Sequence, residues 1–217
     1  MADRTVDLGS IPRDYNLMVA RTGAIEAYSM IEQSLCLLFS HLLGTPQEKA
    51  AIVFFRITNT HSRNHIIERL LEKAHRNQFN AYWDGTKEER GLWTLIRQLD
   101  ARRNEIVHWH NVRNINFEGD KVTTSETLTP PNLWDKGPDS PNITVTDLTD
   151  FIAKGDFVKR SINMFSMTIY FPNIPDAERQ PWLKIFAQPV TYPPPDTHPL
   201  SPNYKAPETQ PQSSGTS

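Results

Sequence analysis

Hydrophobic residues recur at alternating steps of three and four along several long segments of the chain. This spacing places them on one face of an α-helix. In residues 17–43 the apolar stripe consists of Ile25, Tyr28, Ile31, Leu35, Leu38 and Leu42. Gly44 follows this stripe, and glycine commonly ends a helix. The pattern therefore predicts one long amphipathic helix that stops at Gly44.

Two shorter helices are predicted after this glycine. The first begins with Thr45 as its N-cap, Pro46 at the first helical position and Glu48 at the third. Its apolar stripe consists of Ala50, Val53, Phe54 and Ile57. The stripe of the second, within residues 59–76, consists of Ile66, Ile67, Leu70, Leu71 and Ala74. Turn-forming residues in 77–85 are expected to end it.

A fourth helix is predicted to begin near Thr86, with Thr86 as its cap. Its apolar side consists of Leu92, Leu95, Ile96, Leu99 and Ile106. The segment 112–145 then predicts a surface insertion, with a strand pair around Glu118-Gly119-Asp120 and a loop rich in Pro, Asp and Asn. From Thr146 helical spacing returns through Leu148, Phe151, Ile152, Val158, Ile162, Phe165 and Ile169. Gly155 lies inside this last segment and weakens the prediction of an unbroken helix.

Prolines recur densely from Pro172 onward and leave little capacity for helix or central strand. Beyond Pro189 the tail is predicted to be extended or disordered. Trp182, Ile185 and Phe186 are candidates to anchor its first part on the bundle. The predicted fold is an all-α bundle of four to five helices, with a small β or irregular insertion and a Pro-rich C-terminal tail. The corresponding division is residues 1–171 for the bundle and 172–217 for the tail.

Charge and cysteine content restrict the function classes. The 23 basic and 25 acidic residues give a formal net charge of -2, so no global attraction to phosphate backbones or anionic membranes is expected. Any contact with nucleic acid must be local. The single cysteine, Cys36, lies in an apolar stripe and offers neither an intramolecular disulfide nor a thiolate metal cluster. The first residues lack the apolar region of a secretory signal, and we expect a cytoplasmic protein with no membrane contact.

Candidate chemistry is concentrated in RRNEIVHWH, residues 102–110. At about 100° per residue, Arg103 lies on the same arc as the apolar side of its helix, so a half-buried arginine is expected there. Such a charge requires a carboxylate or an anionic ligand. On a straight helix Arg103 and His108 point about 140° apart. They meet only if the helix end is distorted or if a second copy lies across a two-fold axis.

Arg103, the polar Asn104 after it and His108 after four intervening residues resemble the R-x4-6-H motif of HEPN domains (the higher eukaryotes and prokaryotes nucleotide-binding class). The resemblance covers residues 15–170 apart from the insertion. It implies a homodimeric, metal-independent endoribonuclease without a cofactor, in defence or stress response, restrained by an inhibitory protein partner. Arg103 and His108 would be the catalytic pair on RNA, and Asn104 would support them. Arg102, Trp109 and His110 are the expected RNA contacts, His110 standing where some members carry a tyrosine.

The same residues also fit roles without catalysis. A HEPN-like bundle can serve only for dimerisation or nucleotide binding, with Arg103 paired to Glu26 or Glu32. His108 would then be a histidine near a helix C-terminus, where the helix dipole favours a cation, and Trp109 a packing anchor rather than a base-stacking platform. His61 and His65 have zinc-ligand spacing without a third ligand, so a solvated face is favoured. A basic strip for guiding RNA, or simply a soluble surface, would consist of Arg56, Arg63, Arg69, Lys73 and Arg76.

Overall fold

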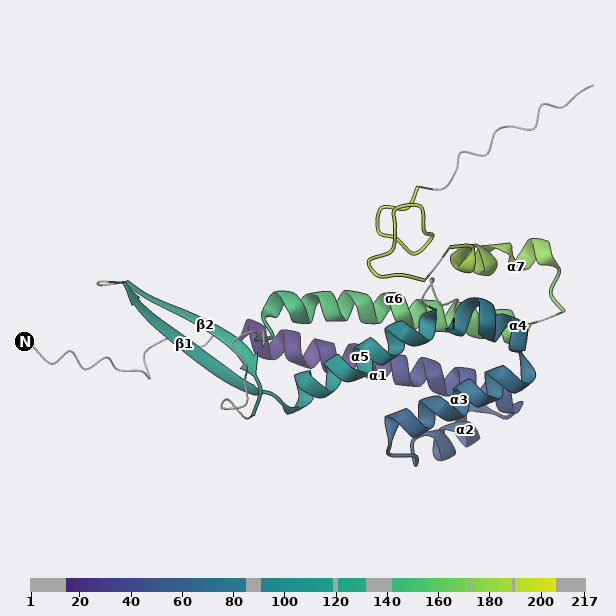
Figure 1. Ribbon diagram of the computed structural model, residues 1–217, viewed down its shortest axis with the longest axis horizontal. Coiled ribbons are helices and arrows are strands. Elements are labelled where there is room, and N and C mark those ends of the chain that lie inside the picture. Colours follow the sequence, from purple (N-terminus) through teal and green to yellow (C-terminus); the bar gives the residue numbers. More distant parts are fainter. Residues whose placement is uncertain are drawn as a thin grey trace, which may run out of the picture. The chain divides into compact units, whose positions relative to one another are not determined.

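The computed structural model describes residues 15–84, 91–118, 121–131, 142–171, 173–188 and 190–205. It is mainly helical, with one two-stranded antiparallel sheet, as predicted (Figure 1). The chain divides into two compact units. The first unit contains Met1–Met30 and Gln98–Asp156, and the second contains Ile31–Arg97 and Phe157–Ser217. The long helices α1 (Asn16–Leu43), α5 (Leu92–His108) and α6 (Val145–Tyr170) contribute residues to both. The division at residue 171 stays a prediction.

In the first unit, α1, α5 and α6 pack against one another. A Cβ added at Gly155 would lie 3.3 Å from the Ala27 Cβ, so this glycine lets α6 approach α1 closely. Lys154 of α6 donates a 2.8 Å hydrogen bond to Gln98 of α5. Helix α6 continues through Gly155 without interruption. The absence of a side chain at Gly155 allows α6 to pack closely against α1. The core of the unit consists of Leu17, Ala24, Tyr28, Leu99, Ile106, Leu128, Ile143, Leu148 and Phe151.

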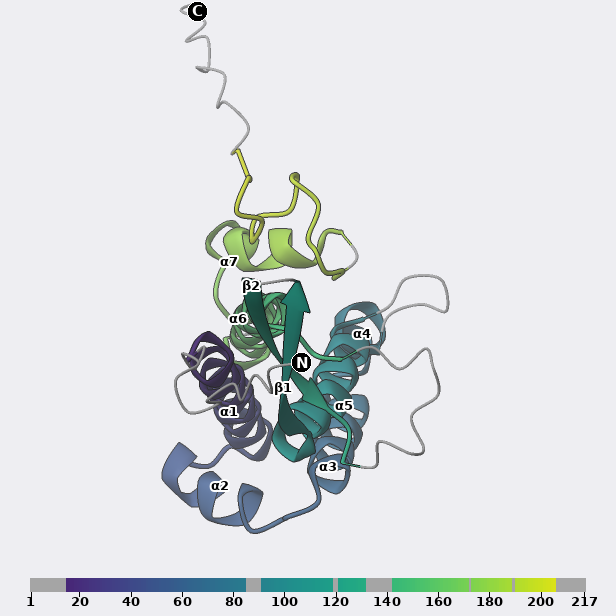
Figure 2. The same cartoon turned by 90° about the vertical axis from the view of Figure 1, so that its left-hand side faces the viewer.

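The predicted strand pair is confirmed as the hairpin of β1 (His110–Glu118) and β2 (Lys121–Thr129). Its register pairs His110 with Thr129 near the helices and Phe117 with Val122 near the tip. At its base, Leu128 and Ile143 exchange two backbone hydrogen bonds of 2.9 and 3.0 Å. The hairpin extends beyond the ends of the helices of its unit, and Figure 2 turns it toward the viewer. Gly119, Asp120 and residues 132–141, for which a loop was predicted, lie outside the described residues.

The second unit contains the end of α1 and the short helices after it. Gly44 has a φ of 60° and ends α1, as predicted. The predicted cap at Thr45 is wrong by one residue, because α2 (Gln47–Phe54) follows Pro46, which caps it without a side-chain hydrogen bond. Asn59 caps the N-terminus of helix α3 (Thr60–Ala74), and its side chain accepts a hydrogen bond from the Ser62 N–H.

The predicted turn in residues 77–85 is also wrong for its described part. The chain continues from α4 (Arg76–Gln78) into a π-helix, η2 (Phe79–Asp84). Phe79 and Trp83 on this π-helix are both buried. The burial of these two aromatic side chains stabilises a helical backbone in this segment, although its asparagine, glutamine and glycine residues by themselves favour a turn. The predicted cap Thr86 lies outside the described residues.

Aromatic rings form much of the core of the second unit. The ring centroid of Trp83 lies 6.0 Å from Trp93 and 5.4 Å from Phe165. The ring centroids of Phe165 and Phe186 lie 6.0 Å apart. The predicted lack of helix after Pro172 is wrong for α7 (Asp176–Leu183) and the 3-10 turn η3 (Lys184–Phe186). Pro175 is tolerated because it occupies the N-cap, where no backbone N–H is required. Ile185 and Phe186 are buried, so their predicted anchoring is confirmed.

A buried histidine fixes the Pro-rich segment 190–205 in the second unit. His198 is fully buried, and its Nε2 lies 2.9 Å from the Ile185 carbonyl oxygen. Its Nδ1 accepts a 3.1 Å hydrogen bond from the Leu200 N–H. The ring also packs edge-on against Phe157. These described tail residues contain no helix or strand.

The predicted apolar stripes differ in how well they match burial. All five apolar residues of the α5 stripe are buried, namely Leu92, Leu95, Ile96, Leu99 and Ile106. The stripes of α1, α2 and α3 are wrong at Ile25, Val53 and Ile66 respectively, which are exposed. Among the described residues, no helix is both long enough and apolar enough to span a membrane.

Candidate functional site

Arg103 is half-buried near the end of α5, as its place on the apolar arc predicted. Its Nη1 donates a 3.1 Å hydrogen bond to Oδ1 of Asn104, and its guanidinium carbon lies 5.5 Å from the centroid of the Tyr28 ring. Within the described residues, none of the ion pairs involves Arg103. The suggested pairing with Glu32 is wrong, because Glu32 pairs with Arg63 in the second unit.

Tyr28 supports Arg103 from the core of the first unit. It is 1% exposed, and its hydroxyl donates a 2.8 Å hydrogen bond to Oδ1 of Asp100. Asp100 lies on α5, three residues before Arg103. The aspartate therefore fixes the position of the Tyr28 ring. The face of this ring attracts the positively charged guanidinium that packs against it. The sequence predicted Tyr28 only as a core residue and did not predict either Tyr28 or Asp100 as part of the candidate site, because the two residues are 72 positions apart.

Arg21 of α1 binds backbone carbonyl groups at the C-terminal end of α5. Its Nη2 donates hydrogen bonds of 2.8 Å to the Val107 carbonyl and 3.1 Å to the Trp109 carbonyl. The Val107 carbonyl belongs to the last turn of the helix, where backbone acceptors have no partner within the helix, and Trp109 directly follows that turn. With this support α5 is unbroken through His108. The distorted helix end is therefore not observed, and Arg103 and His108 point about 140° apart.

The remaining motif residues lie at the end of α5 and at the start of β1. His108 is exposed at the last position of α5, Trp109 is half-buried, and His110 is exposed at the first position of β1. The backbone N–H of Trp109 still donates a 2.9 Å hydrogen bond to the Glu105 carbonyl. The predicted site thus joins Arg103 and Asn104 but does not bring His108 to them within one chain.

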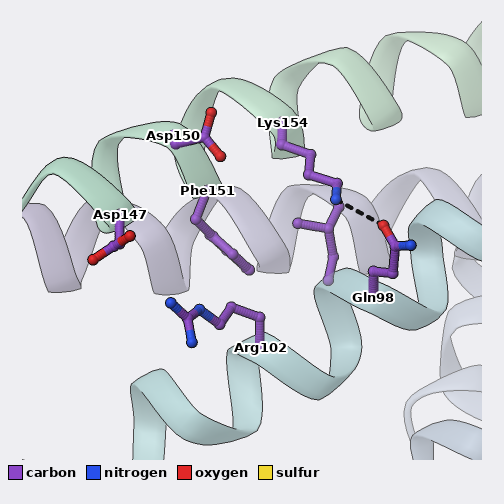
Figure 3. Close-up of a pocket in the computed structure, with 7 residues that line it drawn as sticks. Gln98, Arg102, Asp147, Asp150, Phe151 and Lys154 are labelled. Carbon is purple, nitrogen blue, oxygen red and sulfur yellow. Dashed lines mark hydrogen bonds between the residues drawn. The ribbon is translucent and has the colours of Figure 1, made fainter. Parts of the chain in front are cut away.

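Arg102 points toward α6 (Figure 3). It forms a 2.7 Å ion pair with Glu105 and lines a cavity of about 170 Å³ (Figure 3). Gln98, Asp147, Asp150, Phe151 and Lys154 also line this cavity. Asp147 accepts hydrogen bonds from the Thr144 hydroxyl and N–H at 2.6 and 2.8 Å.

Ionisation in this cavity is balanced between burial and local partners. Burial raises the pKa of Asp147, but the Thr144 hydrogen bonds and the Arg102 charge outweigh it and lower the pKa. Burial lowers the pKa of Lys154, and the Asp150 charge opposes part of this effect. Two cations and two carboxylates therefore line the cavity, and each has a nearby partner.

The basic strip and the histidine pair lie in the second unit. The strip is wrong at Arg63, which is 7% exposed, pairs with Glu32 and places its guanidinium carbon 4.9 Å from the Phe54 ring centroid. The His61 and His65 rings stack, and His65 pairs with Glu68 at 2.9 Å. Among the described residues, no group of three or more His, Cys, Asp or Glu side chains is arranged to hold a metal ion.

Comparison with known proteins gives no further assignment: no family model, no curated protein and no solved structure matches this chain.

Proposed function

We propose that this chain is a cytoplasmic, metal-independent endoribonuclease of the HEPN type, active as a homodimer. The observation that carries the proposal is the state of Arg103. Its guanidinium is held by Tyr28 and Asn104, yet no carboxylate among the described residues neutralises it. A half-buried arginine in this state retains donors for an anion, and a phosphodiester fits its planar fork.

The proposed reaction uses the 2′-hydroxyl of RNA as the nucleophile. His108 acts as general base or general acid, taking the 2′-hydroxyl proton or protonating the departing 5′ oxygen. The 2′ oxygen forms a bond to phosphorus as the bond to the 5′ oxygen breaks, which leaves a 2′,3′-cyclic phosphate. Arg103 holds the non-bridging oxygens, where negative charge accumulates, and Asn104 orients the guanidinium. DNA lacks the nucleophile and is not expected to be cleaved.

The straightness of α5 favours a site shared between two copies. Because Arg103 and His108 diverge on one helix, a two-fold axis is the arrangement that brings an arginine and a histidine together without strain. In the same unit α1 offers an apolar surface for such an association. Met18 is 57% exposed and Val19 is 70% exposed, and exposed apolar patches often mark interaction sites.

Incubation of a mixed RNA pool with purified protein in EDTA tests the proposal. Wild type is expected to cleave RNA, and Arg103→Ala and His108→Ala are expected to lose cleavage while keeping wild-type circular dichroism. Arg97→Ala, which removes an exposed arginine outside both the motif and the predicted basic strip, is the matched control. Equal cleavage by all four proteins would contradict the proposal. A folded, dimeric wild type that leaves the pool intact would favour a non-catalytic dimerisation or nucleotide-binding module instead.

A further inference from the structure

The two faces of the β1–β2 hairpin differ in chemistry. Side chains alternate between the faces of a strand, so the register places Asn114, Asn116, Thr123 and Ser125 on the outer half of one face, with Val112, Thr127 and Thr129 nearer the helices. The four outer residues are exposed, whereas Thr129 is buried. The opposite face carries Asn111, Arg113, Ile115, Phe117, Val122, Thr124, Glu126 and Leu128.

This second face, which we call the apolar face, changes character along its length. Near the helices, Leu128 is fully buried and Arg113 forms a 3.0 Å ion pair with Glu126. Near the tip, Phe117 and Val122 pair directly across the strands, and Phe117 is 56% exposed. The inner half is thus fixed on its unit, while the outer half presents an aromatic ring to solvent.

We infer that the outer half of the apolar face binds single-stranded RNA, with Phe117 stacking on an unpaired base. An exposed aromatic side chain on a strand is a stacking platform for single-stranded nucleic acid, because every base has a π-face. The carboxylate of Glu126 is neutralised by Arg113 and also accepts a 3.2 Å hydrogen bond from Asn111, so it does not repel a phosphate chain strongly.

The hairpin is continuous with the proposed active site, and the inference rests on that proposed function for the identity of the ligand. β1 begins at His110, two residues after His108. Phe117 lies seven residues farther along β1, about 24 Å at the rise of a β-strand. This span corresponds to about seven stacked nucleotides. The hairpin would therefore hold a substrate strand at a distance from the bond that is cut, and would select unpaired RNA.

Binding of fluorescein-labelled single-stranded RNA of random sequence tests the inference, in a His108→Ala background so that the RNA stays intact. Phe117→Ala is expected to raise the Kd at least about fivefold, in line with the loss of one stacked base. The double variant Asn114→Ala/Asn116→Ala, on the opposite face, is the matched control and is expected to leave the Kd unchanged. Phe55→Ala removes another exposed phenylalanine, in the second unit, and is also expected to have no effect. Duplex RNA is expected to bind more weakly and to be insensitive to Phe117→Ala.

Substrate length gives a second readout in protein with His108 intact. Phe117→Ala is expected to raise KM for long RNA without changing kcat, and to have no effect on oligonucleotides shorter than about seven nucleotides. An unchanged Kd in Phe117→Ala, or an equal loss in the opposite-face variant, would overturn the inference.

Failure of the inference is distinguishable from failure of the proposed function. RNA cleavage with no dependence on Phe117 overturns the hairpin alone. Phe117-dependent binding by a wild type that cleaves nothing overturns the nuclease and supports the hairpin. Absence of both binding and cleavage overturns both.

Discussion

The hydroxyl of Tyr28 donates a 2.8 Å hydrogen bond to the carboxylate of Asp100 in the core of the first unit. The same tyrosine ring lies 5.5 Å from the guanidinium carbon of Arg103. The position of the motif arginine therefore depends on α1 as well as on its own helix. Arg21, also on α1, holds the carbonyls at the end of that helix. The candidate site is thus built on two helices rather than on a single helix end.

Tyr28→Phe is expected to lower the free energy of unfolding by about 1–3 kcal/mol, because it removes a buried hydrogen bond and leaves the Asp100 carboxylate without this donor. The ring that supports Arg103 is retained. Urea denaturation measures the change, and Tyr15→Phe, at an exposed tyrosine of the same unit, serves as the control. Equal stabilities for wild type and Tyr28→Phe would show that the hydrogen bond contributes nothing.

Glu32→Leu is expected to cost about 3–5 kcal/mol of stability, because it leaves the buried Arg63 charge without its partner. The Phe54 ring beneath the guanidinium compensates only part of this loss. The exposed pair Arg69–Glu72 provides the comparison, and Glu72→Ala should cost less than about 1 kcal/mol. Similar costs for the two variants in urea unfolding would contradict the burial of Arg63.

Gly155→Val is expected to destabilise the protein by about 1–3 kcal/mol, because its methyl groups would be forced against Ala27 of α1. Ala153→Val introduces the same side chain on an exposed position of α6 and should cost less than about 1 kcal/mol. Thermal unfolding of the two variants measures the difference. If Gly155→Val were the more stable of the two, the close approach of α1 and α6 would be wrong.

Stability is expected to fall as the pH drops below about 6.5, the ordinary histidine value. Burial lowers the pKa of His198, with opposition from its hydrogen bond to the Ile185 carbonyl, and burial also lowers the pKa of His41. The unfolded chain then binds protons that the folded chain does not, so stability present at neutral pH is lost toward acid pH. Urea unfolding at a series of pH values should give a shallower dependence for His198→Gln than for wild type. Parallel curves would exclude His198 as a contributor.

Local sequence patterns predicted the elements whose stabilising contacts are themselves local. The stripe from Leu92 to Ile106 matches the buried side of α5, and Gly44 ends α1 because its backbone adopts a positive φ. The hairpin around residues 118–120 follows from strands flanking a short turn signal.

Contacts between distant segments could not be predicted in the same way. The local sequence predicts Arg63 as one residue of a basic surface strip. Arg63 is buried instead, because Glu32 on another helix pairs with its charge. Residues 79–84 contain turn formers, and the burial of Trp83 among distant rings makes them helical. In the candidate site, Arg103, Asn104 and His108 lie within one short stretch of α5 and could be found as a motif. Tyr28 and Arg21 belong to α1, which several elements separate from α5 in the sequence.

The most direct test of the central claim is activity in an equimolar mixture of Arg103→Ala and His108→Ala, incubated to allow subunit exchange and assayed on RNA in EDTA. If each site takes its arginine from one copy and its histidine from the other, mixed dimers contain one intact site. Cleavage should then return to about a quarter of the wild-type rate, although each variant alone is inactive. A mixture that exchanges subunits but remains as inactive as its components would contradict a site shared between two copies.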